Sequence, residues 1–154
     1  MDSAHMKRAI ELSKKNIETG GGPFGAVIVK DGKIIGEGWN KVTTNNDPTA
    51  HAEVEAIREA CKSIKNFDLT GAEIYTSCEP CPMCLAAIYW ARLSKVYFAN
   101  TKSDAANIQF DDDFIYTEIP KPISDRKISM VQMMHSEALE VFKAWSSSDK
   151  KIPY

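Results

Sequence analysis

The residue types that could do chemistry are concentrated in two short segments of the 154-residue sequence. The first holds His51 and Glu53, two residues apart, and the second holds Cys81 and Cys84, three residues apart. Imidazole nitrogen and thiolate sulfur are ligands that zinc prefers, and a catalytic zinc site keeps one of its four positions for water. His51, Cys81 and Cys84 supply three such ligands, so the sequence predicts a zinc site with one open position.

The predicted helices around these segments suit the same chemistry. Cys81 and Cys84 would share one face of the first turn of a helix, where free N–H groups and the helix dipole lower the pKa of a thiol. Glu53 lies near the start of another predicted helix, beside the metal but not bound to it. This position predicts a general base that takes a proton from water and then gives it to a leaving amine.

A structural zinc site or a redox Cys-x-x-Cys motif is the alternative. A structural site needs a fourth protein ligand. The candidates for it are Cys61, Cys78, His5 and His135. Cys78 is close to Cys81 in sequence, but it ends a predicted strand on the other side of Pro80. The catalytic interpretation is favoured because the two motifs occur in order, each at the start of a predicted helix.

Helices and strands are predicted to alternate along the chain. Helices are expected over residues 4–18, 50–64, 81–92 and 137–147, and strands over 24–29, 33–40, 72–76, 96–99 and 128–134. Asp31 and Gly32 stand between two apolar runs and predict a hairpin. The pattern indicates one layered α/β domain spanning residues 1–154, with a mixed sheet.

Charge and composition narrow the class of partner. The net charge is −2 and the pI is about 5.9, with basic residues scattered among acidic ones. This balance favours a small neutral or cationic substrate over a nucleic-acid backbone, which draws on clustered Lys and Arg. The sequence contains no run of about 18 apolar residues that could cross a membrane. It does not open with an export signal either, so a cytoplasmic protein is expected.

A histidine-x-glutamate motif followed by Pro-Cys-x-x-Cys is the signature of zinc nucleobase deaminases, and the sequence resembles that family over at least residues 20–100. It is most similar to the bacterial guanine deaminases of cytidine-deaminase fold. That resemblance rests on residues 22–32, 45–53 and 87–92, and more specifically on residues 110–116 and the terminal Tyr154. It implies an α/β fold with three α/β/α layers around a five-stranded mixed sheet, and one zinc ion per subunit.

The resemblance also implies roles for residues outside the metal motifs. Asn40 would hydrogen-bond the purine base, Phe24 and Trp90 would wall the pocket, and Tyr154 would close it. Asp112 would accept hydrogen bonds from the substrate and help move protons to the departing amine. Glu137 stands where the family also has an acidic residue. Each has a structural alternative: Asn40 as a turn residue, Trp90 as core packing, and Asp112 as a solvated loop residue.

Guanine is the substrate that these roles favour. It presents N–H donors at N1 and at the amine on C2, and a carboxylate such as Asp112 can accept both. Adenine presents an acceptor at N1, which would leave that carboxylate poorly paired. The expected reaction is hydrolysis of guanine to xanthine and ammonia. Alternatives are a tRNA adenosine deaminase, a deaminase of guanosine, cytosine or a triazine amine, and a non-catalytic zinc-stabilised binding module.

The resemblance finally implies an assembly. In the family, the C-terminal segment, here residues 137–154, crosses to a partner subunit and caps its site. A homodimer formed by domain swapping is therefore expected, with each active site shared between two chains.

Overall fold

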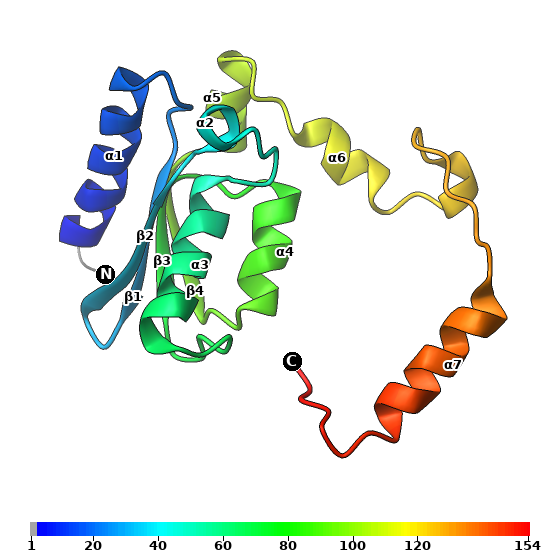
Figure 1. Ribbon diagram of the computed structural model, residues 1–154. Helices are drawn as coiled ribbons and strands as arrows, with labels where there is room; N and C mark the ends of the chain where they lie inside the picture. Colours follow the sequence, from blue (N-terminus) through cyan, green and yellow to red (C-terminus); the bar gives the residue numbers. More distant parts are fainter. Residues whose placement is uncertain (1–2) are drawn as a thin grey trace. The chain divides into compact units, whose positions relative to one another are not determined.

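The computed structural model describes residues 3–154 (Figure 1). The chain forms two compact units, Met1–Asp113 and Phe114–Tyr154. Among the described residues, no helix is both long enough and apolar enough to span a membrane.

The first unit is built on a mixed sheet of four strands. In chain order its elements are α1 (Ser3–Glu18), β1 (Gly25–Lys30), β2 (Lys33–Trp39), α2 (Val42–Asn45), α3 (Ala52–Ile64), β3 (Glu73–Cys78), α4 (Pro82–Trp90), β4 (Lys95–Asn100) and α5 (Lys102–Asn107). The strand order is β2-β1-β3-β4. Strand β1 is antiparallel to β2 and β3, and β4 is parallel to β3.

The predicted hairpin between β1 and β2 is confirmed. Asp31 and Gly32 have φ angles of 50° and 74°, and the two-residue turns that match the twist of antiparallel strands need positive φ at both positions. The first two strands are therefore neighbours, and their far ends place Phe24 and Asn40 side by side. The Asn40 N–H donates to the Phe24 carbonyl oxygen at 3.1 Å.

Helices cover both faces of this sheet, with α1 on one face and α3 and α4 on the other (Figure 1). Strand β1 is buried from both sides because its side chains alternate between the two layers. Ala26 and Ile28 pack in the cluster with α3 and α4. Val27 and Val29 pack with Leu12 of α1. The predicted three-layer α/β/α architecture is confirmed.

Helix α3 lies unusually close to β2, and the sequence explains the approach. A Cβ atom at Gly38 would lie 2.2 Å from the carbonyl oxygen of Ala52, and one at Gly36 would lie 2.5 Å from that of Ala56. Only glycine allows the two backbones to come this near. The start of α3, which carries Glu53, is thereby fixed against the end of β2.

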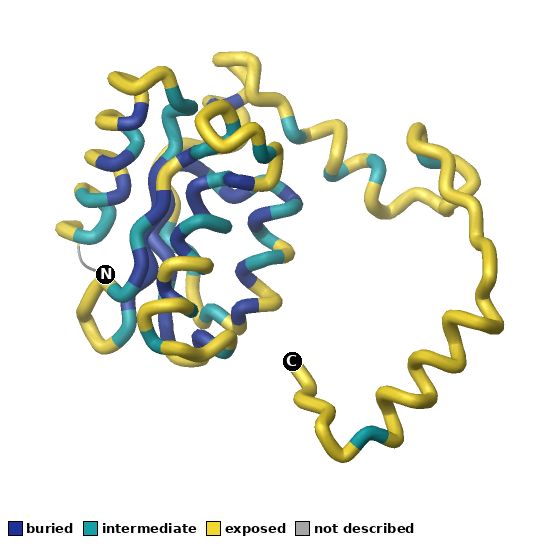
Figure 2. Tube along the Cα trace, viewed as in Figure 1, coloured by how far each residue is buried: buried dark blue, intermediate teal, exposed yellow. Residues whose placement is uncertain are grey.

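The second unit contains α6 (Asp113–Glu118) except for its first residue, a 3₁₀ helix (Ile123–Asp125) and α7 (His135–Ser146). Every residue from 114 to 154 is exposed or half-buried (Figure 2). Many of these residues are large and apolar, among them Phe114, Phe142 and Trp145. Such a surface is typical of a segment that another surface covers.

Two expectations about the elements are wrong. The sheet of the described chain has four strands and not five, and residues 128–134, expected as its last strand, form no helix or strand. A strand exists only where a neighbour pairs with its backbone, and the apolar pattern of a segment does not reveal that neighbour. The short helices α2, α5 and α6 were not predicted, because four to six residues are too few to show a helical period.

Candidate functional site

The three predicted metal ligands come from the starts of two neighbouring helices. His51 is the N-cap of α3 and Cys81 is the N-cap of α4, both with extended backbone. Pro82 occupies the first position of α4, where its missing N–H costs little. The Cys84 N–H donates to the Cys81 sulfur at 3.4 Å. The cap geometry therefore turns Cys81 toward the first turn of its own helix, where Cys84 lies.

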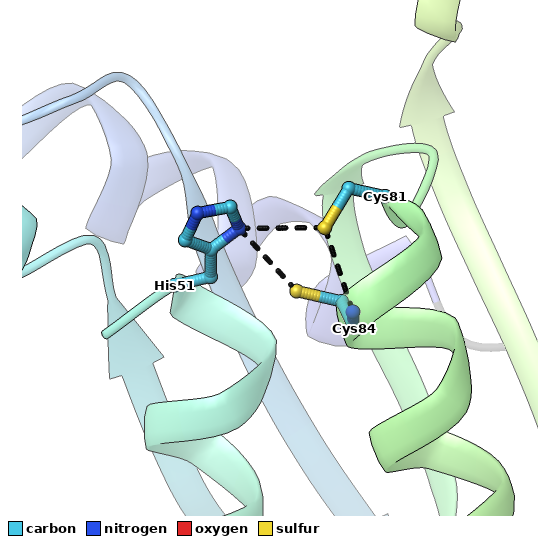
Figure 3. A group of neighbouring side chains, drawn as sticks. All are labelled: His51, Cys81 and Cys84. Carbon is cyan, nitrogen blue, oxygen red and sulfur yellow. Dashed lines mark hydrogen bonds between the residues drawn. The ribbon is translucent and has the colours of Figure 1, made fainter. Parts of the chain in front are cut away.

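The ligand atoms converge on one point (Figure 3). His51 Nδ1 lies 3.5 Å from the sulfur of Cys81 and 3.5 Å from that of Cys84, and all three ligand atoms lie within 4.8 Å of one another. A tetrahedral zinc ion with Zn–S of about 2.3 Å and Zn–N of about 2.0 Å places its nitrogen and sulfur ligands about 3.5 Å apart. The donor set and its spacing fit zinc.

The pKa values of the three side chains place a negative charge in the cluster, which favours binding of a cation. Hydrogen bonds with Cys84 and His51 lower the pKa of the Cys81 thiol to about 4. The same hydrogen bond with Cys81 raises the pKa of Cys84, and that between Cys81 and His51 raises the pKa of His51. Cys81 is thus a thiolate at neutral pH, and a bound divalent cation would remove the Cys84 proton as well.

Within residues 3–154, the cluster contains no fourth His, Cys, Asp or Glu. Cys78 is buried, donates to the Thr101 carbonyl oxygen at 3.7 Å and has its pKa raised to about 11 by burial, so it is a neutral thiol. Cys61 lies 3.9 Å from the Phe67 carbonyl oxygen. His5 packs edge-on against Tyr75 on the α1 side of the sheet. The described ligand set is that of a catalytic zinc site, which keeps a position for water.

Glu53 is a buried carboxyl group beside this cluster. Its side chain is 6% exposed, and the Thr76 hydroxyl donates to its Oε1 at 3.0 Å. Burial raises the pKa of Glu53, which suits a group that both takes and gives protons near neutral pH. Thr76 was not predicted as a site residue, because only the packing of β3 against α3 brings it to Glu53.

One of the three consecutive aspartates at residues 111–113 also lies near the metal cluster. Asp112 is half-buried while Asp111 and Asp113 are exposed. Burial raises the pKa of Asp112, and the negative charge of Cys81 raises it further. The Asp113 N–H donates to Asp111 Oδ1 at 3.0 Å, and Lys102 Nζ lies 3.3 Å from the Asp113 carboxylate. These contacts hold the two outer aspartates in the loop and leave Asp112 as the one near the metal cluster.

Aromatic side chains meet next to this loop. The rings of Phe24 and Phe110 pack edge to face with centroids 4.9 Å apart. Phe110 belongs to the specific segment 110–116, yet no role was predicted for it, because its contact with Phe24 joins residues far apart in sequence. Asn40, 7% exposed, follows β2 immediately beside Phe24. Phe24, Asn40, Phe110 and Asp112 all belong to the first unit.

The other predicted pocket residues are not brought to the metal ligands within the first unit. Trp90 is 66% exposed and ends α4, about 13 Å along the helix from Cys81 at 1.5 Å per residue. Glu137 and Tyr154 belong to the second unit. Their pocket roles stay predictions.

Comparison with known proteins assigns the fold and the site to a family. The model of the cytidine and deoxycytidylate deaminase zinc-binding region matches residues 1–100. The chain belongs to the cytidine and deoxycytidylate deaminase family. Its membership confirms zinc as the metal and a hydrolase acting on a C–N bond as the class of enzyme.

Individual members of the deaminase family extend the likeness beyond the metal motifs. The chain is 55% identical to the guanine deaminase of Bacillus subtilis over 150 residues, which are 97% of this chain and 96% of that one. The X-ray structure of guanine deaminase from Bacillus subtilis matches with a TM-score of 0.96 and 54% identity, covering 100% of this chain and 99% of that one. A tRNA-specific adenosine deaminase of Buchnera aphidicola is 43% identical over 103 residues, 67% of this chain and 68% of that one.

Proposed function

We propose that this protein hydrolyses guanine to xanthine and ammonia, with one zinc ion per subunit. The observation that carries the proposal is the match to a guanine deaminase over nearly the whole chain. It includes the loop that brings Asp112 toward the metal cluster. The four free cysteines, three of them around one metal motif, suit a reducing compartment such as the cytoplasm.

The residues of the chain would divide the chemistry as follows. Zinc, when held by His51, Cys81 and Cys84, supplies an activated water and a positive charge. Glu53 takes one proton from the attacking water and passes it to the ring nitrogen next to C2. After oxygen has added to C2, Glu53 moves the second proton to the amine, and the C–N bond breaks to release ammonia. Its raised pKa lets Glu53 act as base and then as acid.

Substrate choice would rest on groups around this reaction centre. The Asp112 carboxylate accepts from N1–H and from the amine on C2, and charged hydrogen bonds of this kind contribute about 1.5–3 kcal/mol each. Asn40 hydrogen-bonds the base, and Phe24 packs against the ring. Adenine lacks the N1–H donor, so it would leave the carboxylate of Asp112 desolvated and poorly paired.

The direct test is ammonia release from the zinc-loaded protein with guanine, guanosine, adenine, cytosine, a triazine amine and a tRNA anticodon hairpin side by side. We expect strong turnover of guanine alone. Turnover of another amine with silence on guanine would contradict the substrate assignment while leaving the zinc chemistry intact. Deamination of the tRNA hairpin would favour the activity named for the Buchnera aphidicola relative, and silence on every substrate would favour a binding module.

We also propose that residues 1–154 form one deaminase domain and that two chains assemble into a domain-swapped homodimer. In this dimer the C-terminal segment of each chain, residues 137–154, would cap the active site of its partner. The second unit supports this proposal, because its large apolar side chains are exposed within one chain. The first unit exposes apolar side chains too, with Trp90 and Tyr89 on α4 and Phe98 on the edge strand β4. Tyr154 and Glu137 would then act at the partner's site.

A further inference from the structure

A buried polar side chain on α1 connects two segments that end at the proposed pocket. Asn16 is 5% exposed, and its Nδ2 group donates to two carbonyl oxygens, those of Gly22 and Asn40, each at 2.8 Å. Both N–H groups of the amide are therefore used. The carbonyl oxygen of Asn16 also accepts from the Gly21 N–H at 3.0 Å. Asn16 thus joins the glycine segment at residues 20–22 to Asn40, the residue that follows β2.

The two segments carry the residues that we place against the purine. Gly22 precedes Pro23 and Phe24, and Asn40 follows β2. A Cβ atom at Gly22 would lie 3.1 Å from Asn40 Cγ and 3.4 Å from Phe24 Cδ2. The Gly22 backbone therefore packs directly against both side chains, and a shift of this backbone would move both of them.

The Asn40 side chain is held from a second direction. Its Oδ1 accepts from the Val42 N–H at 3.2 Å, at the start of α2. This contact fixes which end of the amide faces α2, so the Nδ2 group is the end that can donate to a purine acceptor. The geometry of this donor depends on the Asn40 backbone, whose carbonyl oxygen Asn16 binds.

We propose that Asn16 is a positioning residue for substrate binding, which acts by holding the Gly22 and Asn40 backbones so that Asn40 and Phe24 meet the base correctly. This inference rests on the proposed function and names a determinant of its substrate site. The Asn16 amide is linked to Phe24 and Asn40 through these two segments. Loss of its amide removes both hydrogen bonds at once and leaves the carbonyl oxygens of Gly22 and of the buried Asn40 without this donor. A displacement of about 1 Å in a substrate-positioning group can cost about 100-fold in rate.

The test is a double-mutant cycle on guanine turnover, with Asn16→Ala, Asn40→Ala and the pair. Val29→Ala serves as a control of stability, since Val29 is buried at the far end of β1. All variants are assayed at a temperature well below their unfolding transitions and at equal zinc content. We expect Asn16→Ala to raise KM for guanine about tenfold or more with a smaller change in kcat. In the Asn40→Ala background, the same change should raise KM clearly less than in the wild type, because only the effect transmitted through Phe24 is left.

A second variant keeps the inference testable if Asn16→Ala does not fold. Gly22→Ala leaves Asn16 intact but presses on Asn40 from the other side, and it should raise KM in the same way. An unchanged KM in Asn16→Ala or Gly22→Ala, or an equal effect of Asn16→Ala in both backgrounds, would overturn the positioning role. A wild-type protein that does not deaminate guanine would instead overturn the proposed function, and the inference would fall with it.

Discussion

At the scale of single residues, Glu53 is the group whose removal should separate metal binding from chemistry. Glu53→Gln keeps the size of the side chain and an acceptor for the Thr76 hydroxyl, but it removes the proton-transferring group. We expect zinc content to stay at one per chain while kcat falls about 1,000-fold, within the usual range for loss of a general acid–base. Metal analysis and ammonia release on the same sample check this. A fully active Glu53→Gln would rule out the mechanism.

The role of Asp112 can be tested against its two neighbours, Asp111 and Asp113, as matched controls. Asp112→Asn should lower kcat/KM for guanine about 10- to 100-fold, because it weakens charged hydrogen bonds to the substrate. Asp111→Asn and Asp113→Asn should change it less than about threefold, because both side chains are exposed and their contacts are with the Asp113 N–H and with Lys102. Such surface groups contribute little. Steady-state kinetics with guanine decide between them. Equal losses in all three variants would mean that the loop acts by its total charge.

The metal ligands could be predicted from sequence because each motif is local. Two cysteines at a helix start lie on one face whatever the rest of the chain does. Asn16, Thr76 and Phe110 could not be predicted in the same way. Their contacts with Asn40, Glu53 and Phe24, respectively, span 23 to 86 positions of the chain. Such contacts depend on how β1, β2 and β3 are paired.

At the scale of elements, the pattern of the chain predicts the first unit well and the second one poorly. Glycine at turns, alternation in β1 and the amphipathic α1 all agree with one sheet covered on both faces. Residues 128–134 have the apolar content of a strand, but a strand is defined by its partner. Within one chain this segment is exposed and pairs with no strand. It could form a strand only by pairing with a second chain.

The ion pair that joins α1 to β2 should contribute a pH-dependent part of the stability. Arg8 Nε lies 2.7 Å from Glu37 Oε1, and this hydrogen bond lowers the pKa of Glu37 below its usual value of 4.5. A lowered folded pKa means that the stabilisation is present above about pH 4.5 and is lost as the pH falls through the lower folded value. Both partners are partly exposed, so the contribution is less than about 1 kcal/mol.

This contribution can be measured by comparing Glu37→Gln with the wild type in urea unfolding at pH 7, 5 and 3. The variant should be less stable at pH 7 and pH 5, and the difference should shrink at pH 3. Glu11→Gln is the control, because Glu11 lies 3.5 Å from the same arginine but is more exposed. A stability difference that persists undiminished at pH 3 would mean that packing, and not charge, explains the effect of Glu37.

At the scale of the whole molecule, the exposed apolar surface of the second unit decides which assembly to test. Phe142 on α7 is 75% exposed within one chain. Phe142→Glu should shift the mass in solution from that of a dimer toward that of a monomer, because a buried unpaired charge is costly at an interface. Glu140→Gln on the same helix should leave the mass unchanged. Light scattering at several concentrations measures both, and a wild-type monomer at every concentration would contradict the assembly.

A swapped dimer also predicts how two damaged chains should complement each other. Glu53→Gln removes the proton carrier from a chain's own site, whereas Tyr154→Ala would remove the cap from the partner's site. In a mixed dimer, one site would carry both defects and the other would carry neither. Random assortment makes about half of the dimers mixed, so about one quarter of all sites should regain wild-type activity after co-refolding. If Tyr154 caps the site of its own chain, every site keeps one defect and co-refolding restores no activity above the average of the two parents.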